Sequence, residues 1–244
     1  MVIGGRKPIL GLLGEARRSA RLLDTLTQVY PRMKTIKSEP NSSLKSQVDE
    51  VVDVLNDGGV VCMPCGGSYR LLADLYNEQA VMNMMQAKRR IATAPSLVFV
   101  AEEKMLEQAA ADVDASARPL MDKLWPGPLT IRFNASREIP KKVRKILTKA
   151  TGKVGIRVPD EQLLRQVVKA LGRPVLVSSA NKEKKHGSAS PAQIRNTFFG
   201  RISLFIDAGD LPEAPSSTVI EVKNGKIKVL REGNMSLEQI KAAL

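Results

Sequence analysis

The chain has 244 residues, of which 43% are hydrophobic, and 38 Lys and Arg against 25 Asp and Glu give it a formal net charge of +13. This length and apolar content suffice for one large domain plus an extension. The charge implies an anionic partner: nucleic acid, a nucleotide or an acidic surface. Aromatic residues make up only 4%, which argues against single-strand binding by base stacking, and two cysteines exclude a disulfide scaffold. No apolar run is long enough to span a bilayer.

Residues 1–45 differ from the rest of the chain and are expected to form a basic amphipathic extension. They carry nine Lys or Arg against three acidic residues. Apolar residues recur at helical spacing, which predicts a helix over 9–30 that Pro31 ends. A linker follows, with Ser43 as a candidate helix cap. The segment is either a docked or RNA-contacting helix, or an organellar targeting segment; its acidic residues favour the first alternative and a cytoplasmic protein.

Residues 46–244 alternate between helical and strand patterns. This alternation predicts a single α/β domain with a largely parallel or mixed sheet flanked by helices. The expected helices are 48–55, 71–88, 104–124 with an interruption near Pro119, 140–149, 162–171 and 191–199. The expected strands are 60–63, ended by Pro64, then 96–100, 129–133, 154–158, 175–178, 204–207 and a terminal pair, 218–222 and 226–230.

Two short polar clusters, Lys88-Arg89-Arg90 and Ser178-Ser179-Ala180-Asn181, each follow an apolar run. The second comes directly after a predicted buried strand. Side chains at the carboxyl ends of strands in an open α/β sheet face the crevice where ligands bind. Two cations, a hydroxyl and an amide that converge there could hold phosphates and a carboxylate, so the clusters indicate a nucleotide enzyme.

Seven phrases occur in order between residues 47 and 234. They are Pro64-x4-Tyr69-x-Leu71, Lys88-x-Arg90 with Pro95, Trp125-Pro126-Gly127-Pro128-Leu129-Thr130, Val154-Gly155-Ile156-Arg157-Val158-Pro159-Asp160, Ser179-Ala180-Asn181, Pro215-Ser216-Ser217-Thr218-Val219 and Leu230-Arg231-Glu232-Gly233. Together they resemble the YrdC family, whose best-known members are threonylcarbamoyl-AMP synthases. The resemblance implies a twisted α/β sheet around a basic cavity.

The reaction implied by this resemblance is an ATP-dependent nucleotidyl transfer. L-Threonine and bicarbonate form a carbamate whose oxygen attacks the α-phosphate of ATP, and pyrophosphate leaves. The product, threonylcarbamoyl-AMP, passes its group to an adenosine beside the tRNA anticodon, so tRNA or a tRNA-modifying complex is the implied partner. Mg2+ is expected to arrive with ATP, because the sequence has no dedicated carboxylate cluster and no metal site is predicted.

The resemblance also implies which residues act. Its catalytic positions are Lys88, Arg90, Ser179 and Asn181, where the cations neutralise carboxylate and phosphates while the hydroxyl and amide bond to nucleotide or carbamate oxygens. The implied substrate- and nucleotide-binding residues are Ser68, Tyr69, Arg157, Ser217, Thr218 and Arg231.

Each group of site residues also has a purely structural alternative. The Lys88 cluster would then be a solvated helix end, where cations suit the helix dipole. Ser179 and Asn181 would satisfy backbone groups of a turn, and Arg157 would pair with Asp160 at the surface.

The first phrase departs from the family pattern. The family's first strand usually ends in Pro-Thr-Asp-Thr-x-Tyr-Gly-Leu, whereas this chain has Cys65, Gly66 and Gly67 at the polar positions and Arg70 in place of glycine. Ala94 replaces the polar residue before Pro95. These changes fall on the amino-acid side of the site, so nucleotide binding is better supported than use of threonine.

Two functions therefore stay open. One is the synthase; the alternative is a non-catalytic or altered-substrate YrdC/YciO-like paralogue that binds nucleotide or RNA. Residues 139–159 are also similar to the YciO branch, but its members tend to lack the full set of four catalytic residues, and this chain has them.

Three further sequence features bear on metal binding and on contacts with anions. Cys62 and Cys65, with one histidine in the chain, are too few to give four zinc ligands, and a core position is expected for Cys62. The basic run 182–187 is either a solvated loop or a lid over ATP phosphates. The helix over 140–149 presents cations that could meet RNA phosphates without base specificity.

Overall fold

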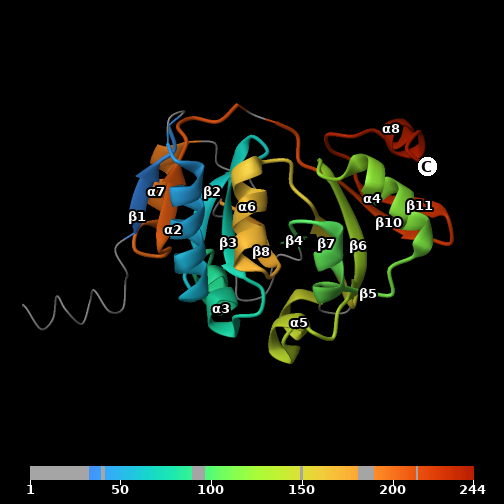
Figure 1. Ribbon diagram of the computed structural model, residues 1–244, viewed down its shortest axis with the longest axis horizontal. Helices are drawn as coiled ribbons and strands as arrows, with labels where there is room; N and C mark the ends of the chain where they lie inside the picture. The colour runs from blue at the N-terminus through green and yellow to red at the C-terminus, as the bar shows by residue number, and fades with distance from the viewer. Residues whose placement is uncertain (1–32, 40–41, 90–96, 149–150, 181–189, 213) are drawn as a thin grey trace, which may run out of the picture. The chain divides into compact units, whose positions relative to one another are not determined.

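Strands from the whole domain pair into one mixed sheet in the computed structural model, which describes residues 33–39, 42–89, 97–148, 151–180, 190–212 and 214–244 (Figure 1). In these residues the sheet has eleven strands. In sheet order they are β1 (Lys34–Lys37), β9 (Leu204–Asp207), β2 (Val61–Cys65), β3 (Ser68–Asp74), β8 (Val175–Ser179), β4 (Leu97–Phe99), β7 (Lys153–Arg157), β6 (Leu129–Ala135), β10 (Thr218–Lys223) and β11 (Lys226–Arg231), and β5 (Ala110–Ala111) pairs with β6.

The sheet contains both parallel and antiparallel pairs. Strand β9 runs parallel to both β1 and β2, and β4 runs parallel to β7. Strands β3 and β8 are antiparallel to each other and to their outer neighbours β2 and β4. The predicted α/β fold with a mixed sheet is confirmed.

Helices flank the sheet. They are α2 (Leu44–Asn56), α3 (Glu78–Ala87), α4 (Arg118–Leu124), α5 (Lys141–Thr148), α6 (Gln162–Leu171), α7 (Pro191–Phe198) and α8 (Leu237–Lys241), with 3-10 turns at Glu103–Gln108 and Ala115–Ala117. Helix α2 packs beside α6 and over β2 and β3 (Figure 1). The pattern predicted α6 to the residue, because its apolar face is regular and Gly172 ends it with φ +69° in the left-handed region.

The prediction of one helix over 71–88 is wrong for its first part. Gly66 and Gly67 have φ of +59° and +70°, so they form a two-residue turn that returns the chain as β3, antiparallel to β2. Helix α3 begins only after Asn77, whose side chain accepts a hydrogen bond from the Ala80 N–H. Pro64 does not end β2, because the pairing with β9 has already stopped at Cys62 and no partner there needs its N–H.

The helix expected over 104–124 is interrupted at 109–114 and not near Pro119, which lies in the first turn of α4. A 3-10 turn, the short strand β5 and a second 3-10 turn precede the helix α4. Asp114 favours this break, because its carboxylate accepts from the Ser116 N–H and caps the second turn.

The compact unit begins at Met33, so residues 33–39 and 42–45, expected in the extension, pack with the domain instead. Strand β1 pairs with β9, and the predicted cap Ser43 starts α2 by accepting a hydrogen bond from the Ser46 N–H. A boundary between 45 and 46 would cut through α2. The helix predicted over 9–30 lies outside the described residues.

Candidate functional site

Lys88 stands at the carboxyl end of α3 and is only 3% exposed. Its ammonium Nζ donates to the Ser178 hydroxyl at 2.8 Å and to the carbonyl oxygen of Ser179. The structure therefore brings together two predicted catalytic positions, Lys88 and Ser179, that are far apart in the sequence. Burial of Lys88 argues against a solvated helix end. The other two predicted catalytic residues, Arg90 and Asn181, and the basic run 182–187 lie outside the described residues.

Arg70 lies directly beside this junction. It pairs with Ser179 in the ladder between β3 and β8, so the two side chains share one face of the sheet. Its Nε is buried without a hydrogen-bond partner. Burial lowers the pKa of the Arg70 guanidinium, and the nearby positive charges of Arg157 and Arg231 lower it further. In the sequence Arg70 is a departure from the family pattern, and the structure places it beside Ser179.

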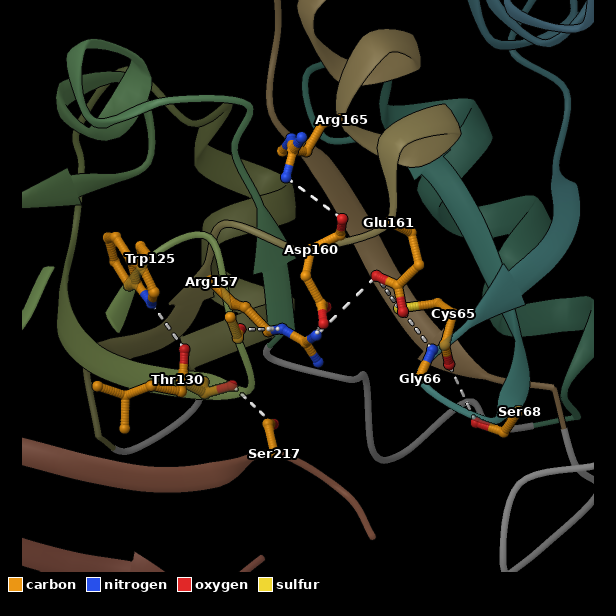
Figure 2. A network of polar contacts seen from close by, with 12 residues as sticks. Cys65, Gly66, Ser68, Trp125, Thr130, Arg157, Asp160, Glu161, Arg165 and Ser217 are labelled. Atoms are coloured by element: carbon orange, nitrogen blue, oxygen red, sulfur yellow. Dashed lines mark hydrogen bonds and ion pairs between the residues drawn. The ribbon is translucent and has the colours of Figure 1, made fainter. Parts of the chain in front are cut away.

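The hairpin between β2 and β3 is held by Glu161, the residue before α6 (Figure 2). The Glu161 carboxylate accepts from the Gly66 N–H and, at 3.5 Å, from the Cys65 thiol. Burial raises the pKa of Cys65 to about 12, and the charge of Glu161 adds to the effect. Ser68, a predicted substrate residue, is buried in the same hairpin, and its hydroxyl donates to the Cys65 carbonyl at 3.5 Å.

The sequence did not indicate a role for Glu161. Its signal was weak: an acidic residue directly before a predicted helix is common for helix-dipole reasons alone.

Arg157, at the end of β7, is 6% exposed and links three segments (Figure 2). Its Nε donates to the Gly127 carbonyl at 2.7 Å, and an Nη2–H donates to Asp160 at 2.7 Å. The guanidinium also lies over the Phe99 ring, 5.7 Å from its centroid, and 4.0 Å from Glu161. The pairing with Asp160 exists, but it is buried on the arginine side rather than lying at the surface.

Ser217, Thr218 and Arg231 form a second cluster. The Ser217 hydroxyl is 2.9 Å from that of Thr130, and Arg231 donates to the Ser217 carbonyl at 2.7 Å. Burial lowers the pKa of Arg231. The Thr218 hydroxyl is fully buried and bonds both backbone groups of Met235, which gives it a structural role in this structure.

Tyr69 is also a core residue rather than an open contact. It is fully buried, stacks edge-on against Phe205 with ring centroids 5.2 Å apart, and donates to the Gly209 carbonyl at 2.7 Å. The Ala208 N–H donates back to its hydroxyl at 3.0 Å. Tyr69 therefore fixes the 208–209 segment and does not present a free hydroxyl. The sequence alone could not distinguish a tyrosine that holds backbone groups from a tyrosine that contacts the ligand, because the residue type is the same.

The cations of this region are suited to oxyanions. Lys88, Arg70, Arg157 and Arg231 come from different elements, whereas the acidic groups near them are Asp160 and Glu161. Such a cluster can neutralise phosphates or a carboxylate. Among the described residues no three His, Cys, Asp or Glu side chains are grouped to hold a metal ion. Cys62 is fully buried in β2, as expected for a core position.

A separate basic groove lies beside α5. Its volume is about 430 Å³, and its lining residues are Ala135, Arg137, Lys141, Arg144, Lys145, Thr148 and Gly152. Arg137, Lys141 and Lys145 are exposed, and Arg144 is held in place by donating to the Ser136 carbonyl at 3.3 Å. No acidic or aromatic side chain lines it.

The family model described as Sua5/yciO/yrdC, telomere recombination, matches residues 53–233. The chain therefore belongs to this family. The match covers the hairpin, the Lys88 junction and both arginine clusters.

Individual relatives agree with the family match. Over 190 residues the chain is 29% identical to the threonylcarbamoyl-AMP synthase of Pyrococcus abyssi, which covers 78% of this chain and 55% of that protein. Over 198 residues it is 28% identical to the threonylcarbamoyl-AMP synthase of Bacillus subtilis, which covers 81% of this chain and 56% of that one. The chain thus spans about half the length of these curated relatives.

Solved structures share the fold. P. abyssi Sua5 complexed with L-threonine superposes with a TM-score of 0.75 at 26% identity, covering 87% of this chain and 60% of the other. E. coli YciO gives a TM-score of 0.72 at 22% identity, covering 86% of this chain and 98% of the other, which supports the fold alone. No helix in the part of the chain that the structure describes is long and apolar enough to cross a membrane.

Proposed function

We propose that this protein makes threonylcarbamoyl-AMP from ATP, L-threonine and bicarbonate. The threonine amine and bicarbonate condense to a carbamate with loss of water. A carbamate oxygen then bonds to the α-phosphorus of ATP, and the bond to the β-phosphate oxygen breaks to release pyrophosphate. The observation that carries the proposal is the junction of Lys88 with β8 inside a cluster of arginines, in a chain of this family.

The proposed chemistry needs positioning and charge neutralisation rather than a covalent intermediate. Lys88 is positioned by β8, so its ammonium can neutralise a carboxylate or phosphate without reorganising. Ser179, beside it, and Asn181 would bond nucleotide or carbamate oxygens, and Arg90 would add a second cation. Ser68, Arg157, Ser217 and Arg231 would surround the nucleotide and substrate, and Tyr69 and Thr218 would act by holding the backbone around them.

The proposal also includes the metal ion, the partner and the cellular compartment of the reaction. ATP would bring Mg2+ on its phosphates, because the described residues offer no cluster of ligands for the ion. The adenylate would serve tRNA modification in the cytoplasm, with tRNA or a tRNA-modifying complex as partner. A basic extension before the domain would be the further contact for such a partner, and a basic cavity would hold the nucleotide.

Pyrophosphate release tests the proposal. With ATP, Mg2+ and bicarbonate, release should depend on L-threonine and should be lost in Lys88→Ala. Lys104→Ala is the matched control, because Lys104 is an exposed lysine paired with Glu102 at 2.8 Å, and it should behave like the unmodified protein. Release that ignores threonine, or that survives in Lys88→Ala, would contradict the proposed reaction.

A second candidate is a paralogue that binds RNA, and the basic groove beside α5 favours it. Its cations face solvent without acidic or aromatic neighbours in the lining, which suits contact with phosphates but not base stacking. Glu138, which follows Arg137 in the chain, accepts from the Tyr76 hydroxyl at 3.4 Å, and Glu78 pairs with Lys142 of α5 at 3.6 Å.

The salt dependence of binding to a fluorescent tRNA tests this candidate. Replacing Lys141 and Lys145 with glutamine should reduce the slope of log K against log salt by about 2, because each phosphate contact releases about one counterion. The same change at Lys226 and Lys228, which are exposed on β11, should leave the slope unchanged. Equal slopes for both double variants would refute the groove as an RNA surface.

A further inference from the structure

Arg70 is the charged side chain of the candidate site whose donors are least used. Its Nε is buried with no partner, and it makes no hydrogen bond or ion pair to another residue in the described ranges. Arg132 also has a buried, unpartnered Nε, but its other nitrogens reach Thr151 at 3.1 Å and Glu221 at 3.2 Å. A buried polar group that finds no partner costs free energy, so it calls for a specific explanation.

The groups around Arg70 do not supply that partner. Glu161 is engaged with the Gly66 N–H and the Cys65 thiol. The neighbouring arginines are themselves anchored, Arg157 on Gly127 and Asp160 and Arg231 on Ser217, and their charges repel that of Arg70. The site is therefore preorganised with positive charge around one guanidinium that has open donors.

The position of Arg70 in the sheet also favours an anionic ligand. Arg70 lies across the ladder from Ser179, whose carbonyl accepts from Lys88, so the open donors lie next to the proposed catalytic junction. A planar guanidinium with free donors binds a carboxylate or phosphate through two parallel hydrogen bonds. A neutral ligand would do nothing to offset the repulsion that Arg157 and Arg231 exert on Arg70, and a cationic ligand would add to it.

We propose that Arg70 binds an oxyanion of the substrate, a carboxylate or a phosphate, and so sets which anionic group the site accepts. The inference rests on the proposed function for the identity of the substrates. The binding step itself requires only an anion beside Ser179.

Calorimetric titration with ATP, inorganic pyrophosphate and L-threonine, each alone, tests this proposal. Arg70→Gln should weaken at least one of them by about tenfold or more, since a hydrogen bond to a charged group is lost. Arg70→Lys keeps the charge but loses the paired donors of the guanidinium, so its affinity should lie between those of the unmodified protein and Arg70→Gln. The matched control is Arg165→Gln, because Arg165 lies in the same network but donates to the Asp160 carbonyl at 3.3 Å (Figure 2).

The three ligands separate the two sources of the oxyanion. Weaker ATP and pyrophosphate binding with unchanged threonine binding assigns a phosphate, and the reverse assigns the threonine carboxylate. If Arg70→Gln binds all three ligands as the unmodified protein does, or if neither protein binds any of them, the proposal is overturned.

Thermal unfolding without ligand distinguishes a binding role from a structural one. Removing a partly buried charge whose Nε has no partner, and which neighbouring arginines repel, should leave the unfolding midpoint of Arg70→Gln unchanged or raise it. A lower midpoint with unchanged binding means that Arg70 is structural. Failure of the proposed function has a different signature: pyrophosphate binding that depends on Arg70, in a protein that shows no threonine-dependent turnover.

Discussion

Replacing Arg157 with methionine removes a buried guanidinium but keeps a long apolar side chain. The substitution decides between the two roles predicted for this residue, a ligand contact and an ion pair with Asp160. In the structure the guanidinium joins the 127 turn, the end of β7 and the segment before α6. If this joining is its main role, the protein without ligand should lose stability.

The size of the loss can be worked out from the contacts. The buried hydrogen bond to the Gly127 carbonyl, at 2.7 Å, involves a charged donor and should contribute about 1.5–3 kcal/mol. The Asp160 side chain is 58% exposed, so that pair should add no more than about 1 kcal/mol. The contact with Phe99 should add about 0.5–1 kcal/mol. We expect a total loss of about 3 kcal/mol, or a midpoint about 6–12 °C lower for a chain of this size.

Urea unfolding followed by fluorescence measures this directly, because Trp125 is the single tryptophan of the chain and lies in the same network (Figure 2). Asp160→Asn is the control and should cost no more than about 1 kcal/mol. If Arg157→Met stays within about 1 kcal/mol of the unmodified protein and loses ATP binding, the structural reasoning is refuted and the residue acts on the ligand.

Two further predictions concern the hairpin that carries Arg70. Gly67→Ala should destabilise the fold by at least about 2 kcal/mol more than Gly152→Ala: both positions have positive φ, but a Cβ at Gly67 would lie 2.4 Å from the Pro212 carbonyl oxygen, whereas nothing lies within 4 Å of Gly152. Equal losses in urea unfolding would show that the clash is relieved. Because its pKa is raised to about 12 from 9.0, the Cys65 thiol should resist iodoacetamide at pH 8.5 in the folded protein. The raised pKa means that the unfolded state loses this proton first, so Cys65 should contribute a fall in stability as pH rises above 9.0, and alkylation as fast as in urea would contradict its burial.

The sequence predicted the regular parts of the fold well. Helix α6 and strand β9 match their predicted bounds, because an unbroken apolar pattern flanked by glycine or proline determines each. The hairpin was missed because residues 71–88 contain enough apolar residues to fit a helix. The pair Gly66-Gly67 favours a turn and so argues against that helix. Comparison with the family phrase led instead to the interpretation that polar residues had been lost there.

The site was predictable only in part, for a similar reason. Motif spacing predicted Lys88 and Ser179 as catalytic, and the structure brings the two residues together, while their catalytic roles stay predictions. Motif spacing could not show that the Tyr69 hydroxyl is hydrogen-bonded to the backbone of residues 208 and 209 and is therefore not available to a ligand. Arg70 lies outside the family pattern, so no motif could assign it a role. The role proposed for it rests on strand pairing and on an unpartnered donor, and both are properties of the folded chain.

The central claim is that the site makes a carbamoyl adenylate, and the nucleotide product tests it most directly. The protein is incubated with ATP, Mg2+, L-threonine and 13C-bicarbonate, and the nucleotides are resolved by mass spectrometry. We predict a product with the mass of threonylcarbamoyl-AMP that carries one 13C, requires threonine and is absent with Lys88→Ala. The proposed reaction would be contradicted if AMP or ADP were the only new nucleotide, or if the protein bound ATP without consuming it.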